Sequence, residues 1–222
     1  MSSAAAERGR FLVLEGIDGC GKTTQLEVLR GWLAGSGVMP PGADLVVTRE
    51  PGGTALGVAL RRLLLHPPAD SRPASLTELL LYAADRAQHV RQRIQPALEA
   101  GHWVLCDRYT GSTAAYQGHG RGLPPAIIRQ LETIATGGLD ADLTLWLDLP
   151  PAAAARRRRH RPADRIEAGG SDFLERVAAG FARLAAERGW QRIDADRSPE
   201  RVTADCCDRI LRCLGRPSPA DG

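Results

Sequence analysis

Short apolar runs alternate with longer stretches of helical character along this chain of 222 residues. Each run is as short and as apolar as a strand buried inside a parallel sheet should be. The five runs are Phe11–Glu15, Leu45–Thr48, Trp103–Asp107, Leu143–Leu149 and Trp190–Asp194. Strands that alternate with helices predict an α/β domain, with a five-stranded parallel sheet and helices on both of its faces.

Leucines with helical spacing follow the first run. Leu26, Leu29 and Leu33 fall on one face of a predicted helix over residues 23–34. The turn before this helix is rich in glycine, so strand, turn and helix follow one another directly. This order favours a ligand site at the N-terminus of the helix, where unpaired backbone amides bind anions.

A longer helical tract covers residues 76–100 and ends before Gly101, a residue type favoured just past a helix end. Pro96 lies within the tract and should kink or divide it. Further along, Pro150 and Pro151 fit a strand exit followed by a helix start, and another helix should begin near Ser171. These helices complete the alternation with the predicted strands.

Length and composition fit one ordinary globular domain, with 43% hydrophobic and 25% charged residues. The chain has no internal repeat and no long linker, so we expect one domain over residues 1–222, with flexible ends at about residues 1–9 and 217–222. No apolar stretch reaches membrane-spanning length, and the N-terminus lacks the apolar core of a signal peptide. Five cysteines without metal-ligand spacing suit reduced thiols, which predicts a cytoplasmic protein.

The glycine-rich turn is a complete G-x4-G-K-[ST] motif, a P-loop. Its lysine, Lys22, is the only lysine among 29 basic side chains. A tight cradle of backbone amides has room for a compact ammonium group, whereas a guanidinium group is bulkier and has fixed donor directions. We expect Lys22 to act on the β- and γ-phosphates of ATP and the Thr23 hydroxyl to bind Mg²⁺. The residues expected to bind ATP are Gly16, Ile17, Asp18, Gly19, Cys20, Gly21, Lys22, Thr23 and Thr24.

Positive charge is concentrated in one short segment, Arg156 to Arg159 together with Arg161. These five charges exceed the net charge of +3, so the rest of the chain is slightly acidic. The distribution argues against a broad nucleic-acid-binding face. The segment is either a solvated surface or a site for concentrated negative charge.

Four further segments, taken with the P-loop, make this chain resemble the thymidylate (dTMP) kinases, which are P-loop nucleoside monophosphate kinases. They are Thr48 to Thr54, Leu79 to Gln88, Asp107 to Tyr109 with Ser112 to Gly122, and Asp164 to Glu167. The resemblance implies a single kinase domain with the P-loop NTPase-type fold, an arginine-rich lid at about residues 156–169, and a homodimer.

Two of these segments follow predicted strands, at the edge where ligands of open α/β sheets bind. By the resemblance, Arg49 binds the monophosphate of the acceptor, and Arg108 adds a second catalytic cation near the phosphates. Asp107 resembles a Walker B aspartate, which holds Mg²⁺ directly or through water. A solvated Arg49 and a purely structural ion pair of Asp107 with Arg108 are the alternatives.

Tyr82 and Arg86 are four residues apart on a predicted helix, so they project from the same face. The resemblance implies that Tyr82 stacks on thymine and that Arg86 donates a hydrogen bond to its exocyclic oxygen. Periodicity alone would favour a core tyrosine beside a surface arginine.

Four other residues complete the acceptor site that the resemblance implies. Asp18 faces the sugar near its 3′-hydroxyl group, directly or through a metal or water, which would explain a carboxylate in a phosphate-binding loop. Thr113, Tyr116 and Gln117 look like base and sugar contacts, and Tyr116 could crowd the 2′ position and exclude a ribonucleotide.

The resemblance also gives the arginine-rich segment a role. Members of the family place a catalytic arginine either in the P-loop or in the lid, and here Thr23 and Thr24 follow Lys22, so the lid must supply it. The candidates are Arg156, Arg159 and Arg165, and the sequence does not decide among them. Such a cation would stabilise the charge on the phosphoryl group in transfer.

The sequence thus predicts ATP- and Mg²⁺-dependent phosphorylation of dTMP to dTDP, for dTTP synthesis, by a protein that binds neither nucleic acid nor membrane. One rival is a P-loop kinase for a deoxynucleoside or another monophosphate. A second rival is a GTP-binding switch protein. It is disfavoured because the chain has no asparagine and no lysine outside the P-loop, so it lacks the [NT]-K-x-D guanine-reading motif.

Overall fold

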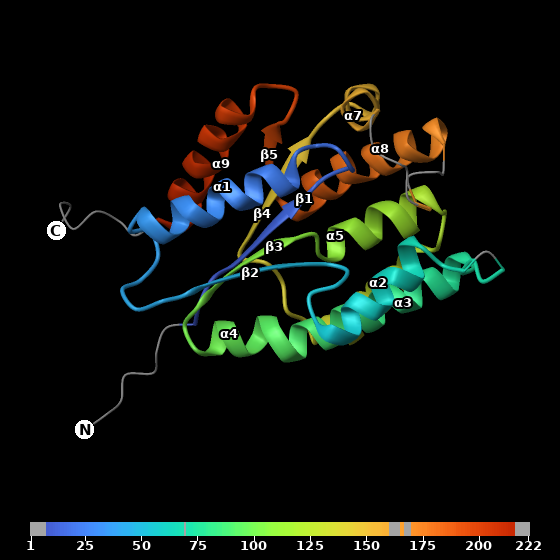
Figure 1. The fold of residues 1–222 in the computed structure, drawn as a ribbon, viewed down its shortest axis with the longest axis horizontal. Helices are drawn as coiled ribbons and strands as arrows, with labels where there is room; N and C mark the ends of the chain where they lie inside the picture. Colours follow the sequence, from blue (N-terminus) through green and yellow to red (C-terminus); the bar gives the residue numbers. More distant parts are fainter. Residues whose placement is uncertain (1–7, 69, 160–164, 167–169, 216–222) are drawn as a thin grey trace.

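The computed structural model describes residues 8–68, 70–159, 165–166 and 170–215 (Figure 1). Much of the expected lid, residues 160–164 and 167–169, lies outside the described residues, as do most of the two ends that we expect to be flexible. Among the helices that are described, none is both long enough and apolar enough to cross a membrane.

A parallel sheet forms the centre of the fold (Figure 1). Its five strands lie in the order β2-β3-β1-β4-β5, and every neighbouring pair is parallel. The strands are β1 (Phe11–Glu15), β2 (Leu45–Arg49), β3 (Trp103–Asp107), β4 (Leu143–Asp148) and β5 (Gln191–Asp194). Each bound lies within one residue of its prediction, and the predicted five-stranded parallel sheet is confirmed.

Helices cover both faces of the sheet, because alternate side chains of the central strand point into different cores. Leu12 packs in one core, which α1 (Lys22–Gly35) and α9 (Pro199–Leu214) cover. Phe11 packs in a second core on the opposite face, together with Ile94. β1 is therefore buried on both sides, as its continuous apolar run predicts.

The long helical tract consists of α3 (Ser75–His89), the π-helix η1 (Val90–Ile94) and α4 (Gln95–Glu99). The division lies just before Pro96, where the backbone N–H of Gln95 donates to the carbonyl oxygen five residues earlier. A proline has no N–H group, and its ring crowds the carbonyl four residues before it. The wider π-helical turn lets the chain pass this point as a helix rather than break.

The remaining helices surround the edge of the sheet where the strands end (Figure 1). α3 packs between α2 and α6, and α8 lies along the π-helix η2. These elements are α2 (Ala55–Leu65), α5 (Thr110–Thr113), η2 (Ala114–Gly120), α6 (Pro125–Thr136), α7 (Pro151–Arg158) and α8 (Ser171–Arg188). Both α7 and α8 begin at the predicted positions.

Candidate active site

A glycine-rich loop joins β1 to α1 and encloses an ammonium group. Gly16, Gly19 and Gly21 have φ angles of 141°, 87° and 99°, which side-chain-bearing residues rarely adopt. Nζ of Lys22 donates hydrogen bonds to the carbonyl oxygens of Gly16, at 2.9 Å, and Ile17, at 3.0 Å. The loop therefore holds a buried positive charge at the N-terminus of α1, where unpaired backbone amides also attract anions.

Two oxygen-bearing side chains near this loop suit a hard divalent cation. Thr23 is exposed in the first turn of α1. Asp107 ends β3, the neighbour of β1, and its Oδ1 atom is buried without a hydrogen-bond partner among the described residues. A buried carboxylate oxygen without a donor is unfavourable unless a ligand supplies its partner.

In the described part of the chain, no group of three or more His, Cys, Asp or Glu residues could hold a metal by itself. Mg²⁺ in kinases commonly takes one or two protein oxygens and completes its shell with phosphate oxygens and water. Thr23 and Asp107 therefore fit Mg²⁺ bound together with a nucleotide.

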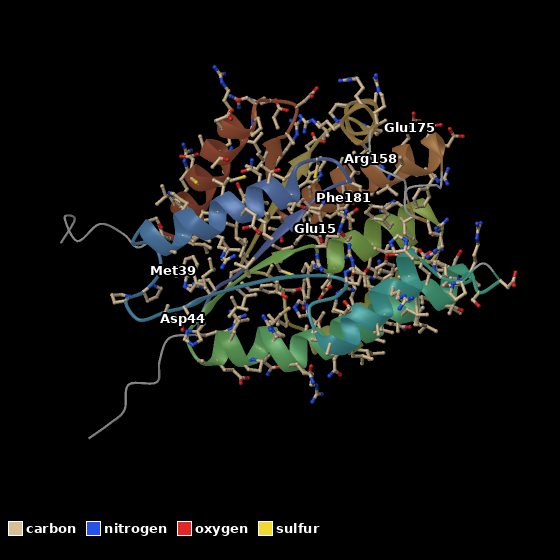
Figure 2. All side chains as sticks on the ribbon, in the orientation of Figure 1. Glu15, Met39, Asp44, Arg158, Glu175 and Phe181 are labelled. Carbon is tan, nitrogen blue, oxygen red and sulfur yellow. The ribbon has the colours of Figure 1, made fainter. Side chains whose placement is uncertain are left out.

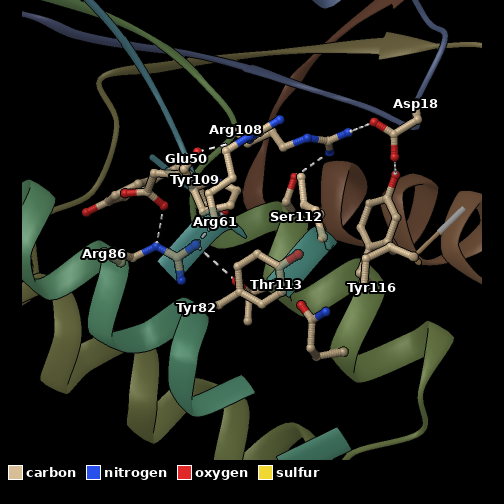
Figure 3. Close-up of a pocket in the computed structure, with 14 residues that line it drawn as sticks. Asp18, Glu50, Arg61, Tyr82, Arg86, Arg108, Tyr109, Ser112, Thr113 and Tyr116 are labelled. Carbon is tan, nitrogen blue, oxygen red and sulfur yellow. Dashed lines mark hydrogen bonds and ion pairs between the residues drawn. The ribbon is translucent and has the colours of Figure 1, made fainter. Parts of the chain in front are cut away.

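Arg108 links the glycine-rich loop to the far side of the site. Its φ of 72° is the only positive value at a described non-glycine residue, and strain of this kind occurs at functional sites. Its guanidinium group donates to Oγ of Ser112 at 2.9 Å and pairs with Asp18, whose second oxygen accepts a hydrogen bond from the Tyr116 hydroxyl at 2.8 Å (Figure 3). Burial alone would raise the pKa of Asp18, but the charges of Arg108 and Lys22 bring it well below its usual range.

Glu15 fixes the segment from Arg108 to Ser112 through hydrogen bonds, a role that the sequence alone did not predict. It is the last residue of β1 and is fully buried inside the fold (Figure 2). Its Oε1 accepts the backbone N–H groups of Tyr109 and Ser112, both at 2.9 Å, and its Oε2 accepts Oγ of Ser112 at 2.6 Å. Burial raises the pKa of Glu15. No local signal marks this role, because the partners lie 94 and 97 residues away along the chain.

Three guanidinium groups, those of Arg49, Arg61 and Arg108, gather at the same edge. Nη1 of Arg61, in α2, donates to the carbonyl oxygen of Pro51 at 3.0 Å. Burial, followed by the charges of Arg49 and Arg108, lowers the pKa of Arg61, so the three groups lie within electrostatic reach of one another. Like charges gathered in a cleft suit an anionic ligand, and guanidinium groups suit phosphate oxygens.

A cavity opens beside this cluster (Figure 3) and contains about 520 Å³ of space, part of it open to solvent. Every residue predicted to bind the acceptor lines it, except Arg49, which is exposed at the end of β2. Glu50, Arg61, Ser112 and Ile166 also line the cavity, although the sequence predicted no role in acceptor binding for any of them. Arg61 could not be found from sequence, since nothing local distinguishes it from its neighbour Arg62.

Tyr82 and Arg86, both on α3, line the cavity. Arg86 is buried, so it is not the surface arginine that periodicity alone favours. Its Nε donates to Oε2 of Glu50 at 2.8 Å, and its Nη2 donates to the Tyr109 carbonyl and to Oγ1 of Thr113, both at 3.0 Å. Its Nη1 makes no hydrogen bond to any described residue, which leaves one nitrogen of a fixed guanidinium group for a ligand.

The Glu-Pro-Gly-Gly turn after β2 supplies Glu50, which fixes the Arg86 guanidinium group. Oε1 of Glu50 lies 3.0 Å from Nδ1 of His89, and Nε2 of His89 lies 2.7 Å from Oγ1 of Thr48. A Cβ atom at Gly53 would lie 2.4 Å from Nε2 of His89, so the turn must carry glycine there to approach the imidazole ring. The turn thus builds a buried polar group around the base of Arg86.

Asp85 joins this buried group without a cation of its own. Its Oδ1 accepts the backbone N–H of Gly52 at 3.0 Å, whereas its Oδ2 is buried and has no partner among the described residues. Burial, followed by the charge of Glu50, raises the pKa of Asp85 to about 6. Asp85 therefore changes its charge in a pH range where ordinary aspartates are already ionised.

The described part of the arginine-rich segment ends α7, near the glycine-rich loop. Arg158, labelled in Figure 2, lies against the loop, since a Cβ atom at Gly19 would meet its Cγ atom at 3.0 Å. Arg156 and Arg159 are exposed, and Arg161 lies outside the described residues.

Arg165, in the described part of the expected lid, contacts α2 and α3 beside the cavity. Its Nε donates to the carbonyl oxygen of Leu64 at 2.8 Å, and its Nη2 pairs with Oε2 of Glu78 at 2.5 Å. The next residue, Ile166, is buried and lines the cavity. In this structure Arg165 therefore links α2, through Leu64, to α3, through Glu78.

Comparisons with known proteins agree with one another. The family model described as thymidylate kinase matches residues 14–206 of the chain. A thymidylate kinase from Synechococcus sp. (strain RCC307) is 65% identical over 195 residues, which cover 88% of this chain and 92% of that protein. One from Parasynechococcus marenigrum (strain WH8102) is 62% identical over 207 residues, 93% of this chain and 99% of its own. The crystal structure of a thymidylate kinase from Ehrlichia chaffeensis superposes with a TM-score of 0.74 at 30% identity, and covers 91% of this chain and 99% of that one.

Proposed function

The chain belongs to the thymidylate kinase family and is a nucleotide-binding kinase, and we propose that it transfers the γ-phosphoryl group of ATP to dTMP, giving dTDP for dTTP synthesis. One observation carries this proposal. A single cavity brings Tyr82 and Arg86, suited to a pyrimidine base, together with Arg61 and Arg108, suited to a phosphate, beside the P-loop.

The acceptor would lie along the cavity with its phosphate toward the P-loop. Arg49, Arg61 and Arg108 would bind that phosphate through charge-assisted hydrogen bonds. At the other end, the ring of Tyr82 would stack on the base, and the free Nη1 of Arg86 would donate to a carbonyl oxygen of the base.

The sugar would lie between these two ends. Asp18 would contact it near the 3′-hydroxyl group, and its ion pair with Arg108 supports this because it ties the sugar contact to the phosphate contact. The hydroxyl of Tyr116 is held by Asp18, so the tyrosine ring would stay in place and exclude a 2′-hydroxyl group.

The donor phosphates would lie on residues 16–24, which are the P-loop and Thr24. The loop amides and Lys22 would hold the β- and γ-phosphates of ATP. Thr23 and Asp107 would hold Mg²⁺, which when bound neutralises charge on the donor phosphates.

In the transfer, an oxygen of the acceptor phosphate forms a bond to the γ-phosphorus as the bond from that phosphorus to the bridging oxygen breaks. The electron pair of the broken bond stays on the departing ADP. The attacking oxygen is already anionic, so no general base is needed. The protein therefore acts by positioning the two phosphates and by stabilising their charge.

We further propose a single kinase domain over residues 1–222, with a lid over about residues 156–169 that closes on the donor phosphates. Arg156, Arg159 and Arg165 remain the predicted catalytic cations of the lid. The exposed positions of Arg156 and Arg159, at the end of α7, leave both side chains free to turn toward a bound nucleotide.

Turnover of a panel of acceptors tests the function. Purified enzyme with ATP and Mg²⁺ should phosphorylate dTMP most efficiently, dUMP less well, and UMP and thymidine poorly, because UMP carries a 2′-hydroxyl group and thymidine lacks the phosphate. Preferred turnover of thymidine or UMP would identify a different kinase. Selective GTP binding without any kinase activity would point to a switch protein instead.

We also propose that the protein is a homodimer. Exposed apolar side chains lie on three helices that pack side by side, with α3 between α2 and α6. They include Leu56 and Val58 on α2, Leu76 and Leu80 on α3, and Ile127 and Ile134 on α6. A second copy of the chain is the partner that such a surface would bury in this family, and a patch of this kind is unusual for a monomer.

The cytoplasmic location is likewise a proposal, which five free cysteines support.

A further inference from the structure

Glu78 is a buried carboxylate on α3 that the transfer mechanism does not use. Glu78 is only 1% exposed, and three side chains donate hydrogen bonds to its two carboxylate oxygens. Oε1 accepts Nε2 of Gln117 at 2.6 Å, and Oε2 accepts Nη2 of Arg121 at 3.3 Å and pairs with Arg165. One carboxylate thus joins α3, η2 and the described part of the lid region.

The contact with Glu78 fixes which end of the Gln117 amide faces the cavity. A carboxylate accepts hydrogen bonds and donates none, so the NH₂ group of Gln117 must point toward Glu78. The amide oxygen of Gln117 is then the end left for a ligand. It accepts no hydrogen bond from any described residue, and Gln117 lines the cavity.

Two fixed groups would therefore face a base bound in this cavity: a donor, Nη1 of Arg86, and an acceptor, Oε1 of Gln117. Thymine presents the complement, because its exocyclic O4 accepts and its N3–H donates. Cytosine presents the reverse on the same edge, with an amino group at C4 and an unprotonated N3. We propose that Glu78 is a positioning residue that selects keto over amino pyrimidines by holding the Gln117 amide in one orientation. This inference rests on the proposed function.

Glu78 can hold the amide only if its own carboxylate does not turn, and two arginines prevent that. Arg165 is anchored a second time by its hydrogen bond to the Leu64 carbonyl. Arg121 lies over the Phe173 ring of α8, with 4.8 Å between its Cζ and the ring centroid. Each arginine is thus fixed by a neighbour as well as by Glu78.

The variant Glu78→Gln tests the proposal. It keeps the size of the side chain but offers Gln117 an NH₂ group as well as an oxygen, so the Gln117 amide can turn over. The measured quantity is the ratio of kcat/KM for dTMP to kcat/KM for dCMP, which we expect to fall by about tenfold or more as one hydrogen-bond preference is lost. The control is Asp142→Asn, which removes the partner of Arg8 and Arg10 beside the start of β1, at the opposite end of the sheet from this cavity, and should leave the ratio unchanged. A folded Glu78→Gln enzyme with the parental ratio would overturn the proposal.

The unmodified enzyme gives a second test, which decides the matter if Glu78→Gln does not fold. In the complex with dTMP labelled with ¹⁵N at N3, the imino proton should be protected from exchange with water, because the amide oxygen of Gln117 accepts it. An imino proton that exchanges as fast as in free dTMP would contradict the proposal. Failure of the parent enzyme to bind or phosphorylate dTMP at all would instead contradict the proposed function.

Discussion

Arg86 and Glu50 form an ion pair of 2.8 Å between Nε and Oε2, with each side chain only 3% exposed. Buried ion pairs contribute little net stability, but removal of one partner leaves an unpaired charge in the interior. Here the pair also fixes the guanidinium group that we assign to the base.

Arg86→Ala should therefore affect both binding and stability. We expect a higher KM for dTMP, and a loss of about 3–5 kcal/mol in the free energy of unfolding, because the buried carboxylate of Glu50 loses its guanidinium partner. Urea unfolding and steady-state kinetics measure the two effects. Addition of Glu50→Gln to Arg86→Ala should restore part of the stability and none of the acceptor binding. If the double variant is no more stable than Arg86→Ala, the buried charge is not the cause.

Lys22→Arg should not preserve activity, although it keeps the charge. The ammonium group fits between the carbonyl oxygens of Gly16 and Ile17, and a guanidinium group is too large for that space. We expect kcat to fall on the order of 10²-fold, or about 2.7 kcal/mol of transition-state stabilisation. Arg30→Lys, at an exposed position on the same helix, is the matched control and should be silent. Near-normal turnover by Lys22→Arg would refute the steric requirement.

Asp107→Asn should separate activity from stability. Since Oδ1 of Asp107 is buried without a partner, loss of the charge should leave the melting temperature unchanged or slightly raised. The Mg²⁺ concentration for half-maximal activity should rise by about tenfold or more, because a hard cation prefers a carboxylate to an amide oxygen. Asp44→Asn, at an exposed side chain, should change neither quantity. An unaltered Mg²⁺ dependence would remove Asp107 from the metal site.

Asp85 should make stability depend on pH in the mildly acidic range. Its folded-state pKa of about 6 lies above its ordinary value of 3.8, so the folded state favours the protonated form. The stabilisation is fully present below about pH 4 and is lost as the pH rises through 6. Asp85→Asn should abolish this contribution to the pH dependence of the free energy of unfolding, as measured by urea unfolding between pH 4 and 7. An identical pH dependence in variant and parent would mean that Asp85 is ionised throughout.

Ile134→Glu should convert the proposed dimer to a monomer, because Ile134 is 76% exposed on α6 and a charge there would have to be buried at the interface. Light scattering coupled to size-exclusion chromatography gives the mass directly. Leu211→Glu is the control, since Leu211 is 50% exposed on α9, outside the three-helix surface. A parent protein that is already monomeric would contradict the homodimer.

The sequence alone determined the strands, the P-loop and the resemblance to a kinase family. These are local properties: an apolar run buries itself as a strand, and glycines with one lysine close a phosphate-binding turn within eight residues. Even the placement of Tyr82 and Arg86 on one face of a helix could be predicted, because they are four residues apart.

Only the tertiary structure decided what surrounds those residues. Arg61 joins Arg49 and Arg108 because α2 packs on α3 and brings Arg61 to the Pro51 carbonyl, in the turn after β2. Glu15 reaches Ser112 across 97 residues of chain. The ion pair with Glu78 likewise brings Arg165 to the acceptor cavity, although the sequence groups Arg165 with the other lid arginines. The physical reason is that hydrogen bonds and ion pairs depend on distances of a few ångströms in space, and local sequence carries no information about which distant elements the fold brings that close.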